Sequence, residues 1–174
     1  MPYFIIAVLL VLADQWVKAW TVANFVSPAV GVPTAKEFLP GLVELTRVHN
    51  YGAGWSSFSG QRWFLAVVSA VVVGLVLYVV LKRIVRHPLG LTAAALVVAG
   101  GIGNLIDRVR LGYVVDMFNL EFMNYPVFNI ADIFVVCGAF VFAFYYLVLH
   151  DKVTAQTQKK TEEAGDDGND HAES

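Results

Sequence analysis

Four apolar runs constrain this chain more than any other feature of its sequence. They cover residues 2–22, 63–81, 89–106 and 130–149, and a helix of roughly 20 residues crosses the hydrocarbon core of a bilayer. With 57% hydrophobic and 15% charged residues among 174, the chain is too apolar for an ordinary soluble domain. We therefore expect an all-α polytopic membrane protein with four transmembrane helices, forming a single domain over residues 1–150.

The first run differs from a secretory signal in its charges. No Lys or Arg precedes its apolar part, no obvious small-x-small cleavage site is present, and Asp14 and Lys18 lie inside it. We interpret it as a retained transmembrane helix. At spacing i and i+4, Asp14 and Lys18 share one helix face and can pair. The pair is either only an intrahelical ion pair at the end of the first helix, or it supports a functional site outside that helix.

The charges of the loops predict the orientation. The link at residues 82–88 holds three bases and no acid, which marks it as cytoplasmic. Four spans then leave both termini in the cytoplasm, while the loops at residues 23–62 and 107–129 face outward. Residues 151–174 contain seven acids, three bases and almost nothing to bury, so we expect a disordered acidic cytoplasmic tail.

Two stretches of the outer loops have strand character. Residues 42–48 alternate in polarity, and residues 113–118 form an apolar stretch interrupted by Asp116. Glycines after Asn50, at Gly52 and Gly54, favour a turn. The outer loops are therefore expected to contain short strands.

Several familiar chemistries have no pattern in this sequence. The four histidines are scattered without an HExxH arrangement, and no G-x-S-x-G elbow is present. The glycine-rich residues 100–103 lack the Lys-Ser/Thr of a phosphate loop and suit close helix packing instead. A net charge of −2 does not indicate a nucleic-acid partner, and a single cysteine, Cys137, excludes an intramolecular disulfide. We expect no metal and no cofactor.

A set of polar residues remains, and the predicted topology collects it at the outer side of the membrane. Its members are Asp14, Lys18, Asn50, Asn104, Asp107, Arg108, Asp116, Asn129 and Asp132. Ionisable groups beside membrane-length segments are costly to bury, so they need partners or a function. Because the set comes from four separate regions, a random scatter of tolerated polar residues does not explain it.

Some members of this set also have a purely structural interpretation. Asp107, next to two arginines, fits an interfacial charge cluster, and we favour that interpretation for it. Asn129 fits a helix N-cap with Asp132 at the third helical position, where an acid complements the helix dipole. Asp116 lies in an apolar stretch and needs a partner, for which Asp132 is the candidate.

Two carboxylates held close together share a proton, because both cannot ionise easily. The ionised member can deprotonate a water while the protonated member donates to a substrate carbonyl, which hydrolyses a peptide without metal or covalent intermediate. A proton- or ion-coupled transporter and a noncatalytic assembly factor are the alternatives. Transporters usually place such groups near the midplane and often have inverted repeats, and this sequence shows neither.

Five short blocks follow one another from the first span to the last. They are DQWVK at 14–18, NYGAGW at 50–55, GNLIDR at 103–108, VVDMF at 114–118 and FNIAD at 128–132. Each block is weak alone, but all five in this order on four spans are specific. In them the chain resembles the lipoprotein signal peptidases, the type II signal peptidase family of bacteria. The second block departs in Gly54-Trp55, where the family more often has Ala-Phe, and the tail matches no block.

The resemblance implies an aspartic endopeptidase of the bacterial cytoplasmic (inner) membrane, with its active site near the outer face and no cofactor. The implied partners are membrane lipids and prolipoproteins whose cysteine carries a diacylglyceryl group, cleaved just before that cysteine, and we expect a monomer. The implied catalytic pair is Asp116 and Asp132. The residues implied to support the site or bind substrate are Asp14, Lys18, Asn50, Gly52, Asn104, Arg108 and Asn129. The resemblance also implies a small extracytoplasmic β-sheet and loop lying on the outer membrane surface.

One hypothesis goes beyond the resemblance. Asp132 lies at a predicted helix N-terminus, whose dipole favours an anion, whereas Asp116 lies in an apolar strand-like stretch. We therefore expect Asp132 to act as the ionised base and Asp116 to carry the shared proton, although such a pair titrates as a unit.

Overall fold

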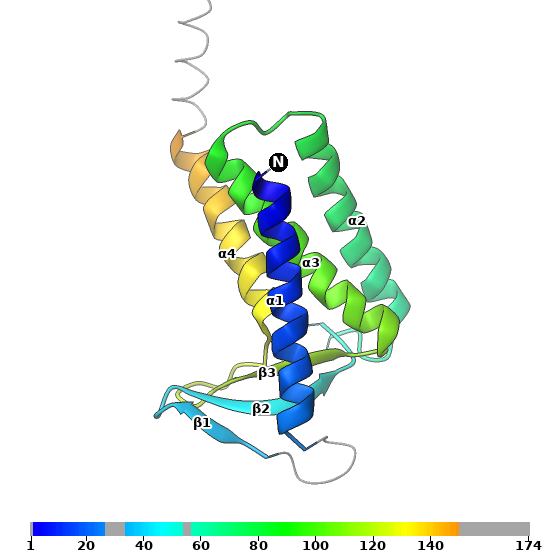
Figure 1. The fold of residues 1–174 in the computed structure, drawn as a ribbon, viewed down its shortest axis with the longest axis vertical. Coiled ribbons are helices and arrows are strands. Elements are labelled where there is room, and N and C mark those ends of the chain that lie inside the picture. The colour runs from blue at the N-terminus through cyan, green and yellow to red at the C-terminus, as the bar shows by residue number, and fades with distance from the viewer. Residues whose placement is uncertain (1, 27–33, 54–56, 150–174) are drawn as a thin grey trace, which may run out of the picture.

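The computed structural model describes residues 2–26, 34–53 and 57–149. Its four long helices are α1 (Pro2–Asn24), α2 (Arg62–Leu81), α3 (Pro88–Arg110) and α4 (Ile130–Phe144), and α4 continues into a π-helical turn, η2 (Tyr145–Leu149). Each is long and apolar enough to span a bilayer, α4 together with most of η2. This confirms the expected four-helix architecture of a multi-pass membrane protein (Figure 1). The tail at residues 151–174 and the end of the NYGAGW block lie outside the described residues.

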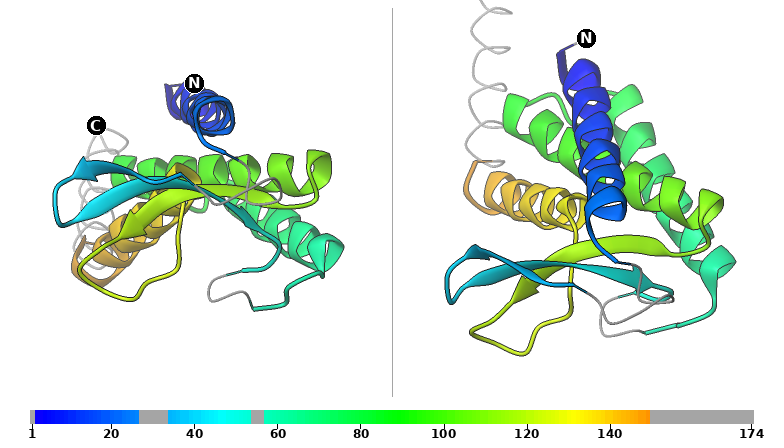
Figure 2. Two further views of the ribbon diagram at one scale, coloured as in Figure 1. Left: turned by 90° about the horizontal axis from the view of Figure 1, so that it is seen from below. Right: turned by 60° about the horizontal axis from the view of Figure 1, so that its bottom comes forward.

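Helix α3 is the centre of the bundle. Figure 2 shows it between α1 on one side and α2 and α4 on the other. In its membrane-length window 39% of residues are buried, against 17% in each of the other three helices. The approach is close: a Cβ added at Gly100 would meet the carbonyl oxygen of Ala131, and one added at Gly103 would meet the Asp14 carboxylate. The predicted close packing of the glycine-rich segment is therefore confirmed.

Helix α3 also runs one turn further than the expected span, which ended at residue 106. It continues to Arg110 and stops before Gly112, which has a positive φ of 85°. Asp107 and Arg108 are therefore helical and do not belong to the outer loop. Asp107 is buried in the protein, so its charge is not exposed to lipid in this extra turn.

A three-stranded antiparallel sheet of order β1-β2-β3 lies across one end of the helices (Figure 1). Its strands are β1 (Lys36–Leu39), β2 (Val43–Asn50) and β3 (Val114–Leu120). Strands β2 and β3 confirm the two predicted stretches. Strand β1 was not predicted, because four exposed residues are too few to show an alternating pattern.

The register of the sheet brings distant residues together. Strand β2 pairs with β3 so that Asn50 lies opposite Val114 and Val48 opposite Asp116. After β3 the chain folds back, and the carbonyl oxygen of Phe128 accepts hydrogen bonds from the Met117 and Phe118 amides. The start of α4 therefore lies beside the middle of β3.

Candidate active site

Asp116 is buried in the middle of β3, with 1% of its surface exposed. Each of its carboxylate oxygens accepts a hydrogen bond from a side-chain amide. Asn129 Nδ2 donates to Oδ1 at 2.7 Å, and Asn50 Nδ2 donates to Oδ2 at 2.8 Å. Because both donors come from other elements, the sheet and the start of α4 together fix the orientation of this carboxylate.

Asp132 lies in the first turn of α4 and is half-buried. It forms a capping box with Asn129: Asn129 Oδ1 accepts from the Asp132 amide at 3.1 Å, and Asp132 Oδ2 accepts from the Asn129 amide at 3.1 Å. The predicted N-cap is thereby confirmed. The other oxygen, Oδ1, accepts from Asn104 Nδ2 at 2.8 Å.

Asn104 and Asn129 connect the two aspartates. Asn129 Nδ2 donates both to Asp116 and, at 3.1 Å, to Asn104 Oδ1, while Asn104 donates to Asp132. Asn129 therefore both caps α4 and contacts Asp116.

A buried cation orients this amide pair. Lys18 Nζ lies 3.0 Å from Asp14 Oδ2 and 3.1 Å from Asp107 Oδ2, and it donates to Asn104 Oδ1 at 3.0 Å. The predicted pairing of Asp14 with Lys18 is confirmed. With an ammonium group at its oxygen, Asn104 must turn its NH₂ group toward Asp132. Lys18 thus acts on the aspartates through Asn104.

Our interpretation of Asp107 as part of an interfacial charge cluster is wrong. The residue is 3% exposed, and its side chain pairs with Lys18 and accepts a hydrogen bond from the Val115 amide at 3.1 Å. Because α3 continues through this position, Asp107 faces α1 and β3, whereas Arg110 is exposed. Asp107 therefore fixes the position of β3 at Val115, the residue before Asp116.

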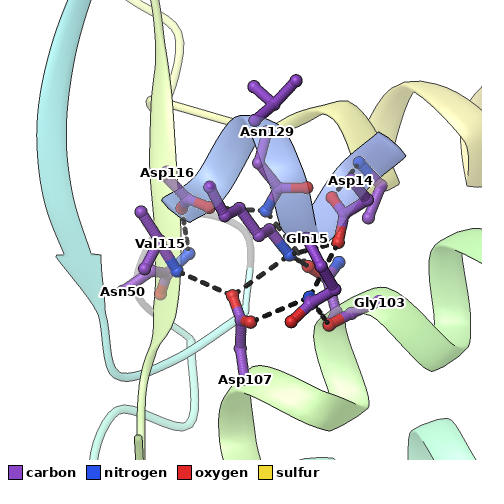
Figure 3. Close-up of polar contacts among 12 residues, drawn as sticks. Asp14, Gln15, Asn50, Gly103, Asp107, Val115, Asp116 and Asn129 are labelled. Carbon is purple, nitrogen blue, oxygen red and sulfur yellow. Dashed lines mark hydrogen bonds and ion pairs between the residues drawn. The ribbon is translucent and has the colours of Figure 1, made fainter. Parts of the chain in front are cut away.

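Gln15 belongs to the same cluster and was missed in the sequence. Its Nε2 donates to Asp14 Oδ2 at 3.1 Å, to the Gly103 carbonyl oxygen at 3.2 Å and to Asp107 Oδ1 at 3.1 Å, as Figure 3 shows. A glutamine inside a membrane-length run was itself the signal, since a polar side chain there needs partners. It was overlooked because consecutive helix positions do not share a face with Asp14 and Lys18.

Asp14 also reaches α4. Its Oδ1 accepts a hydrogen bond from the Ala131 backbone amide at 3.1 Å, and Ala131 lies between Asn129 and Asp132 in the sequence. That amide is one of the unpaired donors at the start of a helix. Helix α1 therefore helps to position the first turn of α4.

Gly52 contributes through its backbone. Its amide donates to Asn50 Oδ1 at 2.9 Å, which leaves the Asn50 NH₂ group for Asp116, and its carbonyl oxygen accepts from Arg108 Nη2 at 3.0 Å. The structure thus brings together every residue that the sequence placed at the site. Among the described residues, no three His, Cys, Asp or Glu side chains could hold a metal ion.

A groove of about 350 Å³ opens onto this cluster between α2 and α4. Its polar end contains Asp116, Asp132 and Arg108, and its walls farther into the bundle are apolar. A second groove of about 280 Å³, entirely apolar, continues between the same two helices and shares Val97 with the first. Together they form a path from the polar cluster along the bundle.

The surroundings of Asp116 favour its protonated form. Burial raises its pKa from 3.8 to about 7; the hydrogen bond from Asn129 opposes this shift, and the nearby charge of Asp132 adds to it. The pair can therefore hold one proton near neutral pH, which suits acid and base catalysis by two carboxylates.

Comparisons with known proteins point to one family. The model of the signal peptidase II (SPase II) family matches residues 6–148. A lipoprotein signal peptidase of Enterococcus faecalis is 41% identical over 159 residues, 91% of this chain and 95% of the relative. One from Lactococcus lactis subsp. cremoris (strain SK11) is 43% identical over 152 residues, 86% of this chain and 95% of the relative.

Solved structures show a similar fold. A bacterial membrane enzyme determined at 2.3 Å resolution superposes with a TM-score of 0.74 at 28% identity, over 87% of this chain and 89% of that one. A second, at 1.9 Å, has a TM-score of 0.74 at 27% identity, over 85% of this chain and 94% of that one.

Proposed function

Because the chain belongs to the signal peptidase II family, we propose that it is an aspartic endopeptidase that removes the signal peptide from diacylglyceryl-modified prolipoproteins. The observation that supports this most is the pair of aspartates, Asp116 and Asp132, joined through two asparagines at the polar end of a long groove. Membership in a peptidase family favours hydrolysis over the transporter and assembly-factor alternatives.

In the proposed reaction Asp132 is the base. Its carboxylate accepts hydrogen bonds from Asn104 Nδ2 and from the Asn129 amide in the first turn of α4. Asp132 takes a proton from a water whose oxygen bonds to the scissile carbonyl carbon, while Asp116 gives its proton to the carbonyl oxygen. When the tetrahedral intermediate collapses, the C–N bond breaks, the nitrogen takes the proton from Asp132, and the hydroxyl proton returns to Asp116.

The raised pKa of Asp116 supports this division of roles, since a group with a pKa of about 7 holds a proton in neutral solution and can still release it. Asn50 and Asn129 would then keep the carboxyl group aimed at the substrate carbonyl. Lys18, Asp14 and Asp107 would act as positioning residues through Asn104 and the first turn of α4.

The groove suggests how the substrate lies. We infer that the apolar signal peptide occupies the path between α2 and α4, and that cleavage occurs before the lipidated cysteine at the polar end. The lipid anchor holds that cysteine in the outer leaflet, which lowers the entropic cost of reaching the site. We propose accordingly that the enzyme lies in the cytoplasmic membrane as a monomer, with both termini in the cytoplasm and the sheet on the outer surface.

The test is cleavage of a diacylglyceryl-modified prolipoprotein by detergent-purified protein. We expect the wild type to release the signal peptide, and Asp116→Asn and Asp132→Asn each to lower kcat by about 10²- to 10⁴-fold. Asn keeps the size and hydrogen bonding of Asp but cannot exchange the proton. Glu37→Gln, at an exposed position of β1, is the matched control and should retain full activity.

An unlipidated prolipoprotein tests the substrate class in the same assay, and we expect it to be cleaved far more slowly. If either Asn variant cleaved at the wild-type rate, the aspartic mechanism would be wrong. Equal cleavage of both substrates would instead overturn the role of the lipid.

A further inference from the structure

A third groove, also apolar, lies apart from the aspartates. It has a volume of about 410 Å³ and runs between α1 and α2 over α3, where its wall includes Tyr3, Ala7, Leu77, Leu81 and Ala95. It shares no lining residue with the groove that opens onto the aspartates, and it shares Val80 and Ala94 with the apolar groove that continues that one along the bundle. Figure 1 shows this end of the bundle, where α1 begins, opposite the sheet.

Three bases lie in the link between α2 and α3, which begins directly after a residue of this groove's wall. Leu81 lines the groove and is followed by Lys82 and Arg83, and Arg86 lies further along the same link, past Val85, which lines the neighbouring apolar groove. All three side chains are exposed, and no ion pair among the described residues includes them. Arg86 Nε donates to the Arg83 carbonyl oxygen at 3.0 Å and so braces the link.

No described acid lies near these bases. The described acids are in the sheet, beside it or in the polar cluster: Asp14, Glu37, Glu44, Asp107, Asp116, Glu121 and Asp132. The end of the bundle that holds the groove is therefore positive on its rim and apolar within.

We propose that this groove and the adjacent link bind an anionic phospholipid, with an acyl chain between α1 and α2 and the phosphate at Lys82, Arg83 and Arg86. Basic pockets between transmembrane helices bind anionic headgroups in this way. An amphiphile matches both observations at once, since its chain fills the apolar volume and its headgroup supplies the missing negative charge.

Two other occupants fit less well. The acidic tail at residues 151–174 could neutralise the bases, but with almost no apolar residues it would leave the groove unfilled. A second copy of the chain could cover the apolar wall, but none of its described acids lies at this end to meet the bases.

The lipid would also connect two helices that each pack on α3. Helix α1 carries Asp14 and Lys18, so a lipid held between α1 and α2 would steady the helix that supports the aspartates. The binding itself depends neither on the proposed peptidase activity nor on the orientation in the membrane.

Native mass spectrometry of the full chain, with equal amounts of phosphatidylglycerol and phosphatidylcholine, tests the proposal. We expect the wild type to retain phosphatidylglycerol in preference to phosphatidylcholine. Lys82→Gln with Arg83→Gln should reduce that preference by about tenfold or more. Arg86 is left in place because it braces the link. Lys36→Gln with Arg110→Gln removes two exposed bases from the opposite end and should leave the preference unchanged.

The groove is tested separately. Ala7→Phe fills it from α1 and should lower retention of both lipids, whereas Ala13→Phe, exposed on α1 outside the groove, should not. Ala7→Leu replaces Ala7→Phe if the larger side chain prevents folding.

Four results would overturn the proposal. The first is equal retention of the two lipids by the wild type, and the second is an unchanged preference in the Lys82/Arg83 variant. The third is that a chain ending at residue 149 retains phosphatidylglycerol while the full chain does not. The fourth is a lipid-free dimer that Ala7→Phe disrupts. The third result would assign the basic link to the tail, and the fourth would assign the groove to a second copy.

Discussion

Asn129 is the residue on which the site depends most directly. Its side-chain oxygen accepts a hydrogen bond from the Asp132 amide at the start of α4, and its NH₂ group donates to Asp116 and Asn104. Its oxygen is committed to the cap, so its NH₂ group must face the other two residues. An aspartate could still cap α4 but could not donate to Asp116 and Asn104, and a leucine could make none of these contacts.

We predict that the two roles of Asn129 can be separated. In Asn129→Ser the hydroxyl can still cap α4 but cannot reach Asp116, whereas Asn129→Ala loses both contacts. Both variants should lose activity by about 10²-fold through misplacement of Asp116. Asn129→Ala should also lower the free energy of unfolding by roughly 1 kcal/mol more than Asn129→Ser. Thermal unfolding measures the loss of the cap, and kcat measures the loss of the contact with Asp116. A fully active Asn129→Ser would show that the hydrogen bond from Asn129 to Asp116 is not needed for activity.

The raised pKa of Asp116 predicts how stability depends on pH. The folded protein binds this proton more tightly than the unfolded chain does, because the pKa rises from 3.8 to about 7 on folding. The stabilisation is full below the unfolded pKa and is lost as the pH rises to about 7. Denaturation in detergent between about pH 4 and about pH 8 should therefore show a decline in wild-type stability that Asp116→Asn lacks.

The same proton predicts the pH dependence of catalysis. If Asp116 is the acid, kcat/KM should fall as the pH rises above about 7, because the carboxyl group is then ionised in the free enzyme. A rate that stays flat from about pH 6 to about pH 9 would show that Asp116 does not supply the proton.

At the scale of elements, α3 decides the arrangement of the others. Its glycines let α1 and α4 approach its backbone, and its last two turns carry Asn104, Asp107 and Arg108 into the polar cluster. The link from α3 to β3 is short, so a displacement of α3 would move the strand that carries Asp116.

Gly103→Ala tests this packing. Its Cβ would meet the Asp14 carboxylate and lie 3.3 Å from the Ala131 Cβ, so we expect a loss of about 1–3 kcal/mol in unfolding free energy and a loss of activity. Gly74→Ala in α2 is the matched control, because nothing lies within 4 Å of its added Cβ. That variant should be as stable as the wild type or slightly more so, by up to about 1 kcal/mol. Equal behaviour of the two variants in thermal unfolding would contradict the close approach.

At the scale of the whole molecule, charge separates the two ends. The described acids gather at the sheet and the polar cluster, while three bases occupy the link between α2 and α3. This asymmetry is what predicts the orientation, since bases in short loops favour the cytoplasmic side.

Cysteine labelling in intact cells tests that orientation. In a Cys137→Ala background, a membrane-impermeant maleimide should label Glu121→Cys, exposed beside the sheet, without lysis. It should label Arg86→Cys only after lysis. The reverse pattern would place the aspartates on the cytoplasmic side. The proposal that the lipidated cysteine of the substrate lies in the outer leaflet would then be wrong.

The sequence by itself was enough for the four spans, two of the three strands and the residues of the polar cluster other than Gln15. Each of these depends on local information: the length of an apolar run, an alternating pattern, or a polar residue in an apolar context. The five ordered blocks likewise identified the family, which the comparisons confirmed.

Only the tertiary structure decided how the cluster is connected. Asp107 was assigned to the interface because its sequence neighbours are arginines, yet the helix turns it inward to Lys18 and Val115. Gln15 was overlooked because its partners come from α3, far along the chain. Hydrogen bonds between segments far apart in the sequence leave no periodic pattern in either segment. The partners of a buried polar side chain therefore depend on how the helices pack and not on its neighbours in the chain.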